Sequence, residues 1–205
     1  LGPVHITNNV ISGNQNNGVE VFSENLAGVF IQGNMIGTDL TGSVAVPNGR
    51  NGIRFVGSPF ANVVGPGNVI SGNTWNGIDL AAGGVSLPNF IMGNRIGISA
   101  TLPGANIGNG LSGITVDSKP ETAVNGHINP SGIALIIGPA NVISDNKGGS
   151  NSADPDTFGD DYAGIIVTGT SAGVKIRGNT VGLGEFPPGT PVSSLAYGNA
   201  GDGII

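Results

Sequence analysis

The chain has 205 residues, a formal net charge of −6 and no cysteine, and its 38 glycines and 24 asparagines make up about 30% of it. Because Gly and Asn are poor helix formers, this composition excludes a helix-rich protein. A hydrophobic content of 38% excludes a disordered chain. Seven Lys and Arg residues against 13 Asp and Glu argue against a nucleic acid partner, and the lack of any run of 18 apolar residues argues against a membrane-spanning segment.

Short strings with alternating apolar residues recur along the chain, and each predicts a β-strand. In chain order they lie at residues 9–14, 18–21, 31–37, 52–55, 68–73, 77–80, 91–97, 113–116, 141–146 and 176–182. They fall into three classes, which are Asn-Val-Ile-Ser-(Gly/Asp)-Asn, Gly-(Val/Ile)-x-(Val/Leu/Phe) and Ile-x-Gly-Asn-x-(Ile/Val)-Gly. Because the strings are short and regularly spaced, we expect parallel strands that stack on their copies in neighbouring coils.

The first and third classes share an Asn that follows an Ile by three positions. The asparagines are Asn14, Asn34, Asn73, Asn94, Asn146 and Asn179, and the isoleucines are Ile11, Ile31, Ile70, Ile91, Ile143 and Ile176. Successive asparagines are 20, 39, 21, 52 and 33 residues apart, which predicts a coil of about 20 residues with longer insertions late in the chain. We therefore expect one all-β domain over residues 1–205, a parallel β-helix with one inward column of Ile and one structural column of Asn.

The chemistry of the repeat supports this interpretation. Gly and Asn adopt left-handed backbone angles at the lowest cost, so a Gly-Asn pair after a strand favours a sharp bend between two faces of a solenoid. Stacked Asn side chains can also bond to one another along the solenoid axis. The Asn column is therefore expected to be structural, as an asparagine ladder, rather than a ligand-binding row.

Further strings carry a resemblance to a known family. The repeated Asn-Val-Ile-Ser-Gly-Asn, together with Gly-Asn-Met-Ile-Gly-Thr-Asp-Leu-Thr-Gly at 33–42, Asn-Gly-Ile at 51–53 and Val-Val-Gly-Pro-Gly-Asn-Val-Ile at 63–70, resembles the right-handed parallel β-helix repeats of large secreted or surface-anchored bacterial proteins. The chain departs from this pattern at 98–135 and at 147–163. The resemblance implies a right-handed β-helix and an extracellular or cell-surface location in bacteria. Since the chain starts without Met and stops in mid-pattern, we expect it to be a fragment of a longer protein.

An acidic insertion at 147–163 is a candidate for chemistry. It contains four carboxylates within eight residues, Asp154, Asp156, Asp160 and Asp161. Carboxylate oxygens around a turn suit Ca²⁺, so calcium is a possible cofactor here, although the spacing is not that of an EF-hand. If the protein is a polysaccharide lyase, hydrolase or epimerase, these same aspartates are the candidate catalytic residues. The architecture resembles that of pectate lyases, polygalacturonases and alginate epimerases, but the fold alone does not choose among them.

A binding face has a better basis in the sequence. The outward neighbours of the core Ile in the third class include two aromatic rings and two cations, which suit sugars or acidic glycans if the rungs align. The predicted ligand-binding residues are Phe30, Gln32, Phe90, Met92, Lys175 and Arg177, with Trp75 and Tyr162 as further exposed aromatics.

The second class predicts a different surface row. Glu20 and Asp79 occupy its equivalent outward position, and Arg54 and Thr115 fill the same slot in other copies, so a mixed-charge, solvated row is expected. His5 and His127 each stand apart from any second metal ligand in the sequence, and both are expected to be turn or surface residues. Three functions remain open, of which the leading one is a non-catalytic module with a structural, adhesive or glycan-binding role. The alternatives are a polysaccharide-active enzyme and a segment of a fibrous or tailspike-like assembly that self-associates through uncapped ends.

Overall fold

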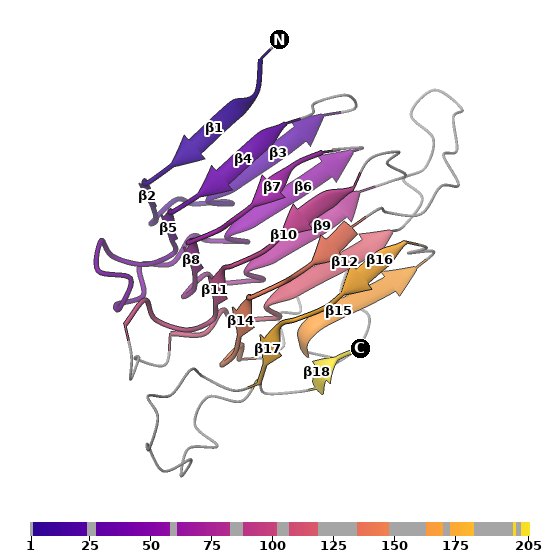
Figure 1. Cartoon of the computed structure of the whole chain (residues 1–205). Coiled ribbons are helices and arrows are strands. Elements are labelled where there is room, and N and C mark those ends of the chain that lie inside the picture. Colours follow the sequence, from indigo (N-terminus) through magenta and orange to yellow (C-terminus); the bar gives the residue numbers. More distant parts are fainter. Residues whose placement is uncertain are drawn as a thin grey trace.

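The structure, a computed structural model, describes residues 2–23, 28–57, 61–82, 88–101, 107–118, 135–147, 163–169, 173–182, 199 and 202–205. The described chain contains strands and turns but no helix, and its strands form three parallel sheets of six strands each (Figure 1). Each sheet takes every third strand in sequence order. This arrangement confirms the predicted all-β class and its parallel β-helix architecture.

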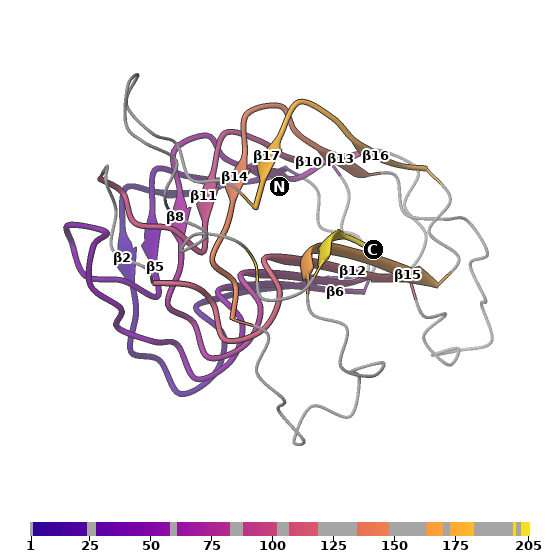
Figure 2. The same ribbon diagram turned by 90° about the horizontal axis from the view of Figure 1, so that it is seen from below.

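Three faces are defined by these sheets, called here sheet A, sheet B and sheet C. Sheet A contains β1 (Val4–Thr7), β4 (Val29–Gln32), β7 (Val63–Val64), β10 (Asn89–Ile91), β13 (Leu135–Ile137) and β16 (Val174–Ile176). Sheet B contains β2 (Val10–Ile11), β5 (Met35–Ile36), β8 (Val69–Ile70), β11 (Arg95–Ile96), β14 (Val142–Ile143) and β17 (Thr180–Val181). Sheet C contains β3 (Val19–Ser23), β6 (Ile53–Gly57), β9 (Ile78–Ala82), β12 (Ile114–Ser118), β15 (Ala163–Gly169) and β18 (Asp202–Ile204). Figure 2 shows sheets A and C on opposite sides, with the short strands of sheet B at one side between them.

One coil, or rung, comprises one strand from each sheet. Val4 pairs with Val29, 25 residues further on, and Phe90 pairs with Ile136, 46 residues further on. The predicted coil of about 20 residues is therefore too short. The Asn of the first string class follows a strand of sheet B, whereas the Asn of the third class follows a strand of sheet A. The spacing between the two classes therefore does not measure one full coil.

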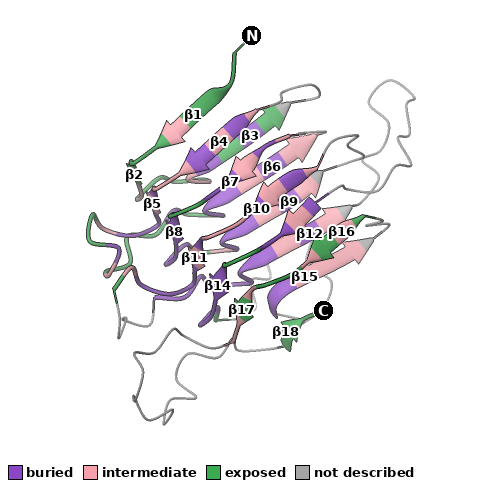
Figure 3. Cartoon of the chain, viewed as in Figure 1, coloured by how far each residue is buried: buried purple, intermediate pink, exposed green. Residues whose placement is uncertain are grey.

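The isoleucine column is corrected for the same reason. The six isoleucines point inward, but they form two columns under two sheets rather than one stack. In sheet A the inward column is Ile6, Ile31, Val64, Ile91, Ile137 and Ile176, and in sheet B it is Ile11, Ile36, Ile70, Ile96, Ile143 and Val181. With the inward side chains of sheet C they form one hydrophobic core, which is most deeply buried in the middle rungs (Figure 3).

The asparagines likewise divide between two ladders. The ladder before sheet B is Asn9, Asn34, Asn68, Asn94, Asn141 and Asn179. The ladder after sheet B is Asn14, Asn48, Asn73, Asn109, Asn146 and Asn199. In each ladder a side-chain amide donates to the Oδ1 atom of the Asn in the next rung, over 2.8 to 3.1 Å. The predicted asparagine ladder is thus confirmed, although its members alternate between two corners of the coil.

From the second rung on, each ladder amide also donates to a backbone carbonyl. The Nδ2 atom of Asn94 donates to the carbonyl of Val64 in the preceding rung, over 3.0 Å, and to Asn141 Oδ1, also over 3.0 Å. Its own Oδ1 accepts from Asn68 Nδ2 over 2.8 Å. Because such a side chain is almost fully buried yet satisfies both its donors and its acceptor, the ladder fixes the stacking of successive rungs without a desolvation penalty.

Candidate functional site

The outer face of sheet A carries a continuous row of side chains along the solenoid axis. Register pairing aligns one outward residue from each rung, in the order His5, Phe30, Val63, Phe90, Ile136 and Lys175. We call this row the sheet A stripe. Its four central members are apolar and half-buried, whereas His5 and Lys175 at its two ends are exposed. Neighbouring rungs are about 4.8 Å apart, so the two phenylalanines lie about 10 Å apart.

A second outward row runs parallel to the stripe, two residues further along each strand. Gln32 lies in this row beside Phe30, and its side-chain amide donates to the Gly65 carbonyl over 3.0 Å. Met92 and Arg177 follow the ends of their strands at the corresponding level, and Arg177 is exposed. The structure therefore brings together six of the predicted ligand-binding residues on one face. From the sequence alone, this shared face depended on whether their rungs align.

The sequence analysis missed three members of the stripe. These are His5, Val63 and Ile136. The rings of His5 and Phe30 stack with their centroids 5.0 Å apart and an interplanar angle of 12°. Val63 lies between Phe30 and Phe90 in the stripe, and Ile136 lies between Phe90 and Lys175. The position of His5 in the stripe could have been predicted from the sequence, since Val-His-Ile-Thr at 4–7 has the same alternation as Val-Phe-Ile-Gln at 29–32.

The remaining predicted aromatics and acids do not join this face. Trp75 lies in the bend that leads into sheet C, half-buried, with the guanidinium carbon of Arg50 5.1 Å from its ring centroid. Tyr162 and His127 lie outside the described residues, and so do the four aspartates predicted for calcium binding or catalysis, Asp154, Asp156, Asp160 and Asp161.

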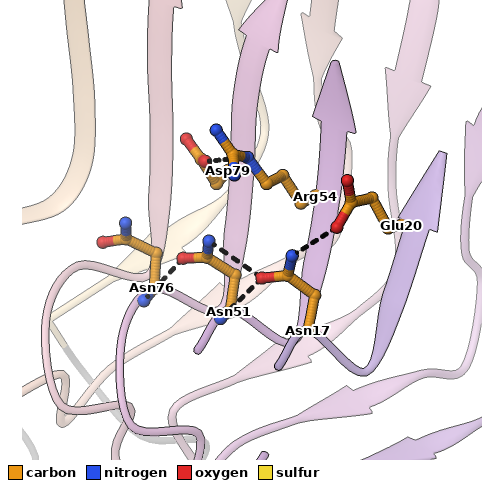
Figure 4. Close-up of polar contacts among 6 residues, drawn as sticks. All are labelled: Asn17, Glu20, Asn51, Arg54, Asn76 and Asp79. Carbon is orange, nitrogen blue, oxygen red and sulfur yellow. Dashed lines mark hydrogen bonds and ion pairs between the residues drawn. The ribbon is translucent and has the colours of Figure 1, made fainter. Parts of the chain in front are cut away.

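The outer face of sheet C carries the predicted mixed-charge row. Glu20, Arg54, Asp79 and Thr115 align from rung to rung, as expected. Asn17 Nδ2 donates to Glu20 Oε2 over 2.7 Å, and Arg54 Nε lies 3.4 Å from Asp79 Oδ2. Figure 4 shows both contacts on neighbouring strands. Because the three charges of this row are paired with one another or with an amide, the row has the character of a structural surface rather than a free binding site.

Two carboxyl groups in the bends after sheet B have shifted pKa values. Hydrogen bonds from the Thr41 hydroxyl and from the backbone amides of Ser43 and Val44 lower the pKa of Asp39. Burial raises the pKa of Asp145 to about 6, against the opposing effects of a hydrogen bond from the Gly108 amide and of the charge of Lys147.

Asp145 occupies a left-handed bend, with a φ of 59°, that corresponds to Gly13 and Gly72 in the other copies of its string, both with a φ of 72°. Asp is one of the few residues other than Gly that adopt this conformation at low cost. Its backbone therefore follows the repeat, while the residue as a whole is only 6% exposed.

Within the described ranges, no three His, Cys, Asp or Glu side chains gather closely enough to hold a metal ion. The same part of the chain has no helix that is long and apolar enough to cross a membrane. Comparison with protein-family models, with curated proteins and with solved structures finds no match to this chain. The exposed faces of the three sheets are therefore the features from which a function can be inferred.

Proposed function

We propose that this chain is a non-catalytic, extracellular β-helix module that has a structural or adhesive role and binds carbohydrate on the outer face of sheet A. The observation that carries the proposal is the alignment of Phe30 and Phe90 in the sheet A stripe, two rungs apart, with Val63 between them. Half-buried aromatic rings with polar neighbours suit the mixed apolar and hydroxylated surface of sugars. The extracellular location rests on the resemblance of the repeat strings to those of secreted and surface-anchored proteins.

The scaffold supports binding by preorganisation. Phe30 and Phe90 lie on strands whose inward neighbours, Ile31 and Ile91, are 0% and 1% exposed in the core. The asparagine ladders hold successive rungs in register, so the positions of the two rings are set before any ligand arrives. A ligand that matches their separation loses little free energy to ordering of the protein.

A glycan array followed by calorimetry with the best ligand tests the proposal. We expect Phe30→Ala and Phe90→Ala each to weaken binding by about 30-fold or more, because truncation of an aromatic anchor at a hot spot costs about 2 kcal/mol or more. Phe22→Ala is the matched control, since Phe22 is 73% exposed and lies on the outer face of sheet C. Circular dichroism checks that all variants remain folded.

Several outcomes would contradict the proposal. One is that no glycan binds, and another is that Phe22→Ala abolishes binding while the two sheet A variants bind normally. A third is that the bound glycan loses mass or gains reducing ends during incubation, which would favour the enzyme hypothesis over a non-catalytic module.

A further inference from the structure

The charges of the described chain are unevenly distributed among its faces. On sheet A the described strands and the residues that follow them carry Lys175, Arg177 and His5 but no carboxylate. The carboxylates of Glu20 and Asp79 lie on sheet C, and others lie in the bends after sheet B. In a chain of net charge −6, an anion that approaches sheet A thus meets two cations and no acid among the residues that the structure describes there.

We infer that the ligand of the sheet A stripe is an anionic glycan, a linear polysaccharide that bears carboxylate or sulfate groups and lies along the solenoid axis. Its sugar rings contact Phe30 and Phe90, and its acid groups pair with Lys175 and Arg177. This inference rests on the proposed carbohydrate-binding function and specifies the class of ligand.

The positions of the two cations fit this assignment. Lys175 lies in the stripe itself, two rungs or about 10 Å beyond Phe90, and Arg177 lies two residues further along the same strand direction, about 7 Å away. Both side chains are exposed, and no hydrogen bond or ion pair joins either of them to another described residue. Their charges are therefore available to a ligand, and the guanidinium group can engage a carboxylate or sulfate through two N–H donors.

The length of the stripe requires a polymer rather than a single sugar. From Phe30 to Lys175 the stripe crosses four rung steps, or about 19 Å, and a monosaccharide cannot contact both ends at once. Once one sugar of a polymer is bound, its neighbours are held close to the other contacts of the stripe at a high effective concentration. Affinity should therefore rise with the number of sugars until the stripe is filled.

A polyphosphate is a poorer match for the same face. Nucleic acids carry about one charge per 1.7 Å of duplex and bind through many Lys and Arg contacts. Here two exposed cations lie at one end of a row of four apolar or aromatic residues, and the rest of the chain is acidic overall. Such a sparse pattern suits a polymer with at most one charge per sugar and with apolar ring faces.

Calorimetry with a galacturonic acid hexamer and with its fully methyl-esterified form tests the inference, since esterification removes the charge and keeps the sugar chain. We expect the acid to bind about 10-fold more tightly than the ester at low salt, and this difference to shrink as salt is raised. Lys175→Gln combined with Arg177→Gln should remove the difference and leave binding of the ester unchanged. The control Arg50→Gln, at an exposed cation in the bend that leads into sheet C, should leave both affinities unchanged.

The failure of this inference is distinguishable from the failure of the proposed function. If the ester binds as tightly as the acid and Phe30→Ala still weakens both, the face binds neutral glycans and the inference is wrong while the proposed function stands. If neither form binds and no charged polysaccharide binds, the inference is wrong, and if the glycan array also yields no ligand, the proposed function is wrong as well. Binding of single-stranded DNA that depends on Lys175 and Arg177, without any glycan binding, would also overturn both.

Discussion

Removal of one buried ladder amide provides a quantitative test of how the rungs are held together. In the ladder after sheet B, Asn73 is 1% exposed and accepts from Asn48 Nδ2 over 2.9 Å. Its own Nδ2 donates to Asn109 Oδ1 over 2.9 Å and to the Ile36 carbonyl over 3.3 Å. Asn73→Ala removes these three bonds, and at about 0.5–1.5 kcal/mol each the free energy of unfolding should fall by about 3 kcal/mol.

The same ladder supplies the control. Asn14 is exposed in the first rung, and its side chain makes one ladder bond, from Nδ2 to Asn48 Oδ1 over 2.8 Å. Asn14→Ala should therefore cost about 1 kcal/mol or less. Asn73→Leu separates hydrogen bonding from packing, because it keeps a similar volume but leaves the neighbouring polar groups unsatisfied, and it should also be destabilising by about 2 kcal/mol or more.

Urea unfolding followed by circular dichroism measures these differences. Because a solenoid can unfold rung by rung, hydrogen exchange of the Gly110 amide, which donates to the Asn73 carbonyl over 2.8 Å, provides a local readout. Equal small losses for Asn73→Ala and Asn14→Ala would refute the reasoning, since the ladder would then contribute no more in the core than at the solvated end. A Leu variant as stable as the wild type would show that volume rather than hydrogen bonding determines the effect.

Three further predictions follow from the fold. The raised pKa of Asp145 means that the folded state binds the proton more tightly than the unfolded state, so stability should fall as pH rises from about 4 through about 6, and Asp145→Asn should remove this dependence in pH-resolved urea titrations. A Cβ atom on Gly77 would lie 2.7 Å from a backbone carbonyl oxygen of the next rung, so Gly77→Ala should lower the unfolding free energy by about 2–3 kcal/mol, whereas Gly203→Ala, with one contact at 3.7 Å, should be nearly neutral in the same assay. A double-mutant cycle on Arg54 and Asp79 should give a coupling below about 1 kcal/mol, because their side chains are 25% and 15% exposed, and a much larger value would assign this pair a greater role than surface pairing.

The fold class could be predicted from the sequence because each rung repeats the same local chemistry. A strand with an inward Ile followed by a Gly-Asn bend is recognisable in isolation, and glycines such as Gly33 and Gly93 do adopt left-handed angles, with φ of 67° and 63°. The number of such bends in one coil could not be predicted in this way. Two corners with the same bend chemistry give the same string, and only the pairing of Ile31 with Val64 rather than with Ile70 distinguishes them.

The candidate site was predictable to a similar degree. Period-2 alternation identified Phe30 and Phe90 as outward residues, and their alignment followed from their equivalent strings. Val63 and Ile136 were missed because a Gly-Pro bend follows their strands in place of the Gly-Asn bend, so these segments do not match the Ile-x-Gly-Asn string. The apolar continuity of the stripe depends on these two residues, and it emerges only from the register between rungs.

The three sheets differ in how far their outward side chains are buried by other parts of the chain or paired with one another. This difference favours sheet A as the face that binds a ligand. On sheet B the outward residues Val69 and Val142 are only 3% and 4% exposed, and the bend around Gly42 packs near Met35. On sheet C, Arg54 pairs with Asp79, and Glu20 accepts a hydrogen bond from Asn17. The interior is fixed by core columns and ladders, where substitutions are costly. The proposed glycan would therefore meet half-buried aromatic rings and exposed cations on sheet A, where substitutions should alter its binding without disturbing the scaffold.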